Sequence, residues 1–261
     1  MFFNSAVLLA GAGFAVAQSL SSQCESTLLS IAASSSDTCL NPSALVSIAL
    51  LNSSSSIIPG VNTWLSGLCS QGACSNSTLQ TVVTAVVSGC STELASLGLT
   101  TTDPTALVSS IQDAYPTVRQ LVCLKDTSTS TLCTPEVLTN IQSATATNMT
   151  LNNTVALITK LVTGQSAGVP SSAICVDCTK AAYTVLNQGL PSIANATQSP
   201  LSSQCGTNYT DGQMPSDIQE SASNSSSSTT SSSGAIALSV SSLNMGAAVV
   251  AAVSAAFAIL A

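Results

Sequence analysis

Histidine is missing from this 261-residue chain, and lysine and arginine together number only 4. Without histidine, neither a Ser-His-Asp nor a Cys-His catalytic site can be assembled. The 4 cationic residues stand against 11 acidic ones, which gives a formal net charge of −7. Because nucleic acids and anionic membrane surfaces are bound through clustered cationic side chains, we expect neither as a partner.

Aromatic residues make up only 3% of the chain, which leaves few platforms for stacking sugars. A glycoside hydrolase also needs two carboxylates that face each other. Most of the acids stand at expected helix starts or in loops, where capping accounts for them: Glu25, Asp37, Asp103 and Glu136. We therefore interpret the protein as non-enzymatic, without a catalytic residue. A hydrolase with paired carboxylates and a Ser-Lys site remain as alternatives.

Ten cysteines are present, an even number. In a secreted chain they should all form disulfides. The absence of histidine and the oxidising compartment argue against a metal site, and we expect no metal and no cofactor. Cys175-Val-Asp-Cys178 has the spacing of a redox pair. A thioredoxin-like site needs a βαβ setting, which the sequence does not suggest, so we prefer structural disulfides.

The amino terminus resembles a secretory leader. Ala6 to Val16 is apolar, and Ala15-Val16-Ala17 fits a small-x-small cleavage site. We predict cleavage before Gln18, with a buried first helix as the alternative.

The carboxyl terminus predicts a lipid anchor. Ser221 to Ser233 is almost entirely Ser and Thr, which predicts a disordered stalk suited to O-glycosylation. Small residues, a mixed spacer and the apolar run Met245 to Ala261 then follow, as in a glycosylphosphatidylinositol signal. The preferred attachment residue is Ser233, or its neighbours Ser232 and Gly234. A transmembrane helix is the alternative, but the run is short and no Lys or Arg follows it.

Sequons for N-glycosylation occur throughout the chain. They begin at Asn52, Asn76, Asn148, Asn152, Asn195, Asn208 and Asn224. Each one that carries a glycan must be exposed to solvent.

Helical spacing of apolar residues dominates the body, and no alternation of period two is sustained. Ser22-Gln-Cys-Glu25 reads as a capping box, and Asn41-Pro42 as a capped helix start. Pro116 should kink a helix without ending it. We predict helices at about 22–33, 42–51, 61–68, between Cys74 and Gly89, and at 92–99, 104–122, 134–141, 153–164 and 175–188, with an irregular segment around Cys205. The fold class is an all-α, disulfide-stapled bundle.

The cysteines fall into two sets of five, which leaves a degenerate duplication open. The predicted organisation is a signal peptide (1–17), two helical cysteine-rich modules (18–123 and 124–215), a Ser/Thr-rich stalk (216–233) and a removed anchor signal (234–261).

Residues 24–123 resemble the elicitins, which are small all-helical secreted sterol carriers. The match is in six cysteines with a four-residue gap between the third and fourth and a helix before the fifth. The resemblance implies the bridges Cys24–Cys90, Cys39–Cys74 and Cys69–Cys123. The remaining four cysteines would then pair as Cys133–Cys178 and Cys175–Cys205. No tyrosine lies between Cys24 and Cys90, a departure that bears on the family's sterol pocket.

The whole chain also resembles a group of fungal secreted, lipid-anchored proteins. The matching features are Ser21-Ser-Gln-Cys24, Trp64-Leu-Ser-Gly-Leu-Cys69 through Cys74-Ser75, the stalk and the anchor signal. This resemblance implies location rather than an activity. We expect a structural or adhesive glycoprotein on the outer leaflet or in the cell wall, with cell-wall glycan as a possible partner. The alternative is a lipid or sterol carrier whose ligand would lie against Trp64, Val82 and Val86.

Overall fold

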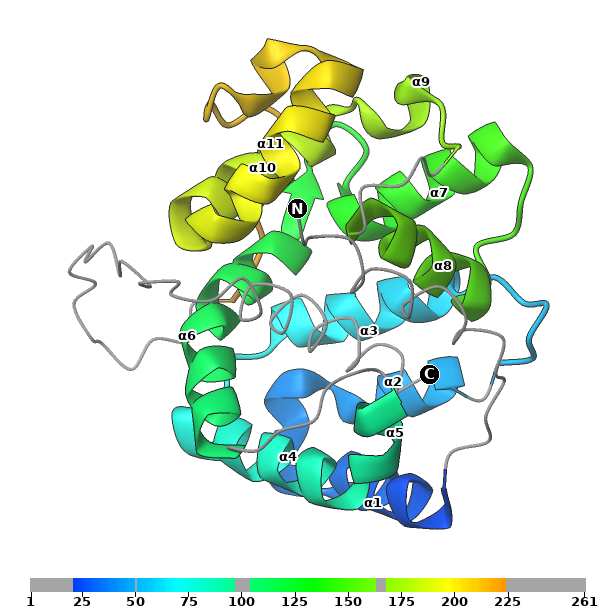
Figure 1. The fold of residues 1–261 in the computed structure, drawn as a ribbon, viewed down its shortest axis with the longest axis vertical. Helices are drawn as coiled ribbons and strands as arrows, with labels where there is room; N and C mark the ends of the chain where they lie inside the picture. The colour runs from blue at the N-terminus through cyan, green and yellow to red at the C-terminus, as the bar shows by residue number, and fades with distance from the viewer. Residues whose placement is uncertain (1–20, 50, 97–103, 163–167, 224–261) are drawn as a thin grey trace, which may run out of the picture.

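The computed structural model describes residues 21–49, 51–96, 104–162 and 168–223; the remainder is drawn as a grey trace in Figure 1. The predicted signal peptide, Asn224, the three candidate anchor residues and the apolar tail therefore lie outside the described residues.

Within the described ranges the chain is a disulfide-stapled, all-α fold with one small sheet, as the sequence predicts. The helices are α1 (Ser22–Ala33), α2 (Pro42–Ala49), α3 (Ile58–Ser70), α4 (Asn76–Gly89), α5 (Ser91–Ser96), α6 (Pro104–Val122), α7 (Cys133–Thr145), α8 (Leu151–Val162), α9 (Ser171–Ile174), α10 (Asp177–Gly189) and α11 (Pro191–Cys205), with short 3-10 helices η1 (Ser35–Leu40) and η2 (Thr207–Thr210). The strands are β1 (Leu124–Asp126), β2 (Thr131–Leu132) and β3 (Ile218–Glu220).

The first half of the chain forms the lower part of Figure 1 and the second half the upper part. α4 packs on both α1 and α6, while α2 packs on α3. The long helix α6 continues through Pro116 and leads from the lower to the upper part. In the upper part, α10 packs on α11, and α9 packs on α7.

The two halves share a core, although no disulfide joins residues 18–123 to the rest. α3 packs on α7, and α6 packs on α10; we call these two contacts the seam. Leu132, from the second half, lies in one buried cluster with Leu65 and Trp64 of α3. The predicted modules are therefore packed together through apolar side chains.

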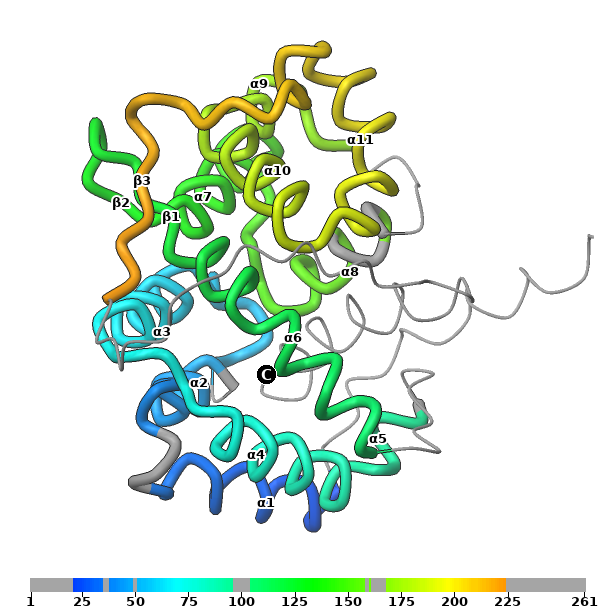
Figure 2. Tube along the Cα trace, turned by 90° about the vertical axis from the view of Figure 1, so that its left-hand side faces the viewer, coloured from blue at the N-terminus to red at the C-terminus, as the bar shows by residue number. Residues whose placement is uncertain are grey.

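The small sheet is a feature that the sequence did not predict. β1 lies between β2 and β3 and pairs antiparallel with both (Figure 2). Strands of two or three residues are too short to show an alternating pattern. Because β3 is part of this sheet, residues 216–223 belong to the fold, and the prediction that the stalk begins at residue 216 is wrong.

Two further helix predictions need correction. The segment after Gly189 was expected to be irregular, but Pro191 occupies the first turn of α11, which runs to Cys205. Between the helices predicted at 153–164 and 175–188, the structure has an additional short helix, α9, which begins at Ser171.

The caps also differ from the predicted ones. Ser21, not Ser22, caps α1 and accepts a hydrogen bond from the Cys24 N–H. Its own N–H donates to Glu93, 72 residues away, and not to Glu25. The start of α8 has a cap of the same kind as α1, since the Asn153 N–H donates to the Thr150 hydroxyl.

Candidate functional site

The stretch from Cys69 to Cys90, which we call the cysteine clamp, joins the ends of α3 and α4 and holds three cysteines. All ten cysteines of the protein are paired, in the three pairs that the elicitin resemblance implies and the two pairs predicted for the remaining four cysteines. The bonds are Cys24–Cys90, Cys39–Cys74, Cys69–Cys123, Cys133–Cys178 and Cys175–Cys205. The clamp therefore ties the end of α6 to the end of α3, the η1 segment to the loop before α4, and α1 to the end of α4. Its sulfurs are structural.

Side chains of α6 also hold the loop of the clamp. Tyr115 and Arg119 lie one turn apart, and Gln112 lies nearly one turn before Tyr115. The hydrogen bonds run from Arg119 Nη2 to the Gln71 carbonyl, from the Cys74 N–H to the Tyr115 hydroxyl (3.0 Å), and from Gln112 Nε2 to the Asn76 carbonyl (2.8 Å). One face of α6 thus satisfies backbone groups between α3 and α4.

Arg119 is the buried charge of this region, with only 5% of its surface exposed. Its guanidinium contacts the carbonyl of Gln71, the residue that caps the carboxyl end of α3. A helix carries a partial negative charge at that end, which stabilises a cation placed there. No pattern in the sequence marks this role, because the partner is a backbone carbonyl 48 residues away.

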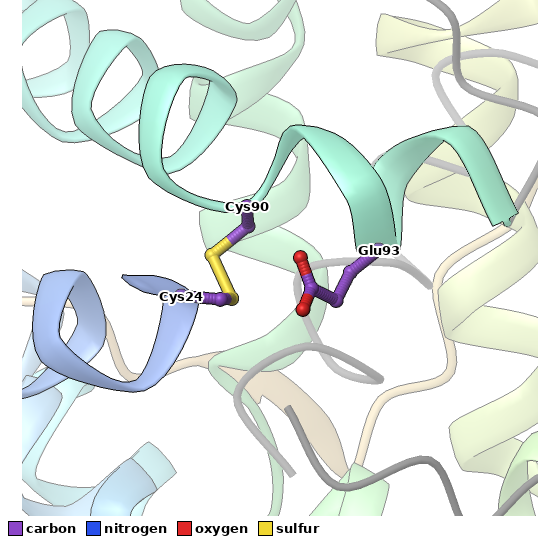
Figure 3. Close-up of side chains that lie close together, drawn as sticks. All are labelled: Cys24, Cys90 and Glu93. Atoms are coloured by element: carbon purple, nitrogen blue, oxygen red, sulfur yellow. A yellow bond between two sulfur atoms is a disulfide. The ribbon is translucent and has the colours of Figure 1, made fainter. Parts of the chain in front are cut away.

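Cys24, Cys90 and Glu93 lie close enough together to suggest metal ligands (Figure 3). The two sulfurs are bonded to each other, so neither is a thiolate that could bind a metal. Glu93 Oε1 accepts the Ser21 N–H at 2.7 Å. Burial raises the pKa of Glu93. The hydrogen bonds with Ser21 lower it, and together with the bond from the Glu93 backbone they outweigh the effect of burial, so the pKa is below its ordinary value. The group is a junction between α1 and α5.

The three residues of the predicted ligand face do not form one surface. Trp64 is buried, and its Nε1–H donates to the Leu40 carbonyl at 2.8 Å. It packs in the core cluster that includes Leu65. Val86 packs against a separate cluster around Cys24 and Cys90, while Val82 is half-buried on α4. Trp64 is therefore a core residue with its polar atom satisfied.

The Cys175-Val-Asp-Cys178 motif is divided between two bridges. Cys178 is buried and bonded to Cys133, whereas Cys175 is half-buried and bonded to Cys205. The two sulfurs of the motif are not bonded to each other. The Cys178 bridge ties α10 to α7, and the Cys175 bridge ties the end of α9 to the end of α11.

The six sequon asparagines among the described residues are all exposed to solvent. Asn52 lies between α2 and α3, and Asn76 begins α4. The others are near the start of α8, on α11 and in η2: Asn148, Asn152, Asn195 and Asn208. All six side chains are exposed. They occupy both halves of the molecule, so glycans attached to them would spread over its surface.

The comparisons with family models, curated proteins and solved structures give no match. Among the residues that the structure describes, no helix is both long and apolar enough to span a membrane. The five disulfides are typical of a secreted or extracellular protein.

Proposed function

We propose that the protein is a non-enzymatic glycoprotein of the cell surface or cell wall, with a structural or adhesive role, tethered through its carboxyl end. The observation that carries this proposal is the exposure of all six described sequon asparagines on a body whose ten cysteines are all bridged. Such a body withstands an oxidising extracellular environment, because the bridges restrict its unfolded states.

The position of the last described residue also supports the tether. The last described residue, Ser223, donates its N–H to the Cys69 carbonyl at 2.8 Å. The Ser/Thr-rich segment follows directly, and then the apolar segment that resembles an anchor signal. The tether would thus be attached at the cysteine clamp, with the glycan sites spread over the body.

The interior supports a structural role more than a carrier role. Trp64 is packed among aliphatic side chains of α2 and α3, and Leu65 at the same level is completely buried. Val86 belongs to another cluster. The face expected to hold a sterol or lipid is therefore divided between separate clusters.

Release from cells tests the tether. The full chain is expressed on its cell surface and treated with a phospholipase C specific for phosphatidylinositol. We expect the protein to be released, and mass spectrometry to show that the apolar tail is absent. A protein that stays in the membrane with an intact carboxyl terminus would refute the anchor.

Glycosylation is tested site by site. Asn→Gln at each of the six described sequons should remove one glycan mass wherever the site is used. Asn187→Gln is the matched control, since Asn187 is exposed but lies outside any sequon. If peptide-N-glycosidase leaves the mass of the wild-type chain unchanged, the glycoprotein proposal fails. Extraction of the purified protein with organic solvent should yield no stoichiometric lipid; a bound sterol would favour the carrier instead.

A further inference from the structure

The segment Gly206–Ser223, which we call the strap, follows the last cysteine of the protein. Every disulfide closes at or before Cys205. The strap is therefore a terminal segment of the fold that can move away without the breaking of a covalent bond. The ten cysteines keep the rest of the body cross-linked when it does.

The strap is held by a short ladder, by apolar side chains and by polar contacts. Ala222 packs against the core cluster around Trp64 and Leu65, and the Tyr209 hydroxyl donates to the Cys175 carbonyl at 2.6 Å. Strand β3 of the strap pairs with β1, with Lys125 opposite Gln219. Ile218 is 4% exposed and packs in a cluster with Leu124 and Val185. Nearer to Cys205, Asp211 forms the ion pair with Lys180 at 2.8 Å; the Lys180 ammonium lowers the pKa of Asp211.

The end of the strap crosses from the second half of the protein to the first. The Ser221 N–H and hydroxyl both donate to the Cys123 carbonyl, at 2.9 and 2.7 Å. The Ser223 N–H donates to the Cys69 carbonyl. Cys69 and Cys123 are bonded to each other, so the strap ends on the bridge between α3 and α6. Figure 2 shows it descending past the sheet to α3.

These contacts break in sequence when the chain is pulled from its carboxyl end. Tension at Ser223 acts first on its hydrogen bond to the Cys69 carbonyl. The bonds from Ser221 to Cys123, and then those of β3 to β1, carry the load only after the preceding contact has broken. The process stops at Cys205, which the bridge to Cys175 holds. Gly206 and Gly212 have φ of 90° and 75°, conformations that suit glycine and give the strap two turning points.

We propose that the strap is a detachable part of the tether, which lengthens the link between body and anchor while the body stays folded. This role rests on the proposed function. A fully extended chain of 18 residues, the length of the strap, spans about 60 Å, and one of ten residues, the length of 224–233, spans about 35 Å. Detachment would therefore nearly triple the reach of the body from its anchor.

Hydrogen exchange measured by mass spectrometry on the full, disulfide-intact protein tests the proposal. Local opening gives a segment its own exchange rate, so peptides within 213–223 should exchange at least tenfold faster than those of α3 and α10. Ile218→Ala should speed exchange in the strap on the order of 30-fold or more. Its control is Gln219→Ala, an exposed neighbour on the same strand, which should change the rate little.

A cross-link provides the second arm of the test. Lys125→Cys with Gln219→Cys places two cysteines opposite each other, at a separation that suits a disulfide. The bridged variant should slow exchange in the strap to the rate of the helices, while Lys125→Ser with Gln219→Ser should not. A strap that exchanges only together with α3 and α10 in the wild type would overturn the proposal.

The two proposals fail separately, because hydrogen exchange reports on the folded body whether or not it carries a lipid. Fast strap exchange in a protein that the phospholipase does not release supports the detachable strap and overturns the anchor. Release by the phospholipase together with a strap as protected as the helices supports the anchor and overturns the strap.

Discussion

Replacing Gly189 by alanine should loosen the seam between the two halves. Gly189 is the last residue of α10, and a Cβ there would overlap the side chain of Thr117 on α6. It would lie 2.6 Å from Thr117 Cγ2 and 2.8 Å from its Cβ, and closer still to Oγ1. Threonine is branched at Cβ, so rotation about χ1 replaces one close atom by another.

The magnitude follows from two opposing effects. Alanine is favoured over glycine in a helix interior by about 1 kcal/mol, and by less at the last residue. Overpacking of this kind costs about 1–3 kcal/mol. We expect a net loss of roughly 1–2 kcal/mol. For a domain of about this size, the corresponding fall in Tm is about 2–8 °C.

The assay is thermal and urea unfolding of the disulfide-intact protein, followed by circular dichroism. Thr117→Ala makes room for the new methyl group, so the double variant should recover most of the loss. The coupling energy between the two sites should be about 1–3 kcal/mol. A Gly189→Ala protein that is more stable than the wild type, or that Thr117→Ala does not rescue, would refute this account of the seam.

Three further substitutions test other parts of the fold. Arg119→Met should lower the free energy of unfolding by about 1–3 kcal/mol, because the Gln71 carbonyl loses a charged donor, and urea unfolding measures this. Trp64→Phe keeps the apolar contacts but leaves the Leu40 carbonyl without its partner, so the same assay should show a loss of about 1 kcal/mol. The Ser128 hydroxyl and the backbone N–H groups of Ser128 and Thr129 donate to the Asp126 carboxylate and lower its pKa. The ionised carboxylate therefore stabilises the fold above about pH 4, and this stabilisation is lost as pH falls through the lowered pKa. Tm measured from pH 7 to pH 2 should therefore differ between wild type and Asp126→Asn at pH 7 and converge in acid.

The helical plan could be predicted because apolar spacing and helix starts are local signals. Pro42 and Pro104 open α2 and α6 as predicted, and Gly89 ends α4. The same local reasoning failed at Pro191. A proline soon after a glycine can either follow the end of one helix or begin the next, and here it begins α11.

Long-range contacts could not be predicted from spacing. Glu93 binds Ser21 across 72 residues, and β3 pairs with β1 although each strand has three residues. Neither partner carries a pattern that marks the other. The role of Trp64 was ambiguous for a related reason, since an apolar helix face is equally consistent with a core and with the wall of a ligand site. The hydrogen bond from its Nε1 atom to the Leu40 carbonyl identifies it as a core residue.

The Cys24–Cys90 bridge cannot form until some time after Cys24 has been synthesised. A chain made from its amino end contains Cys24 long before its partner, which follows 66 residues later. At 5–20 residues per second, this delay is about 3–13 s. During it, Cys39 and Cys69 are already present as wrong partners, and the first helix still lacks the carboxylate of Glu93. An oxidant that acts at once would form non-native pairs, which thiol–disulfide exchange would have to correct before the native bridges could form.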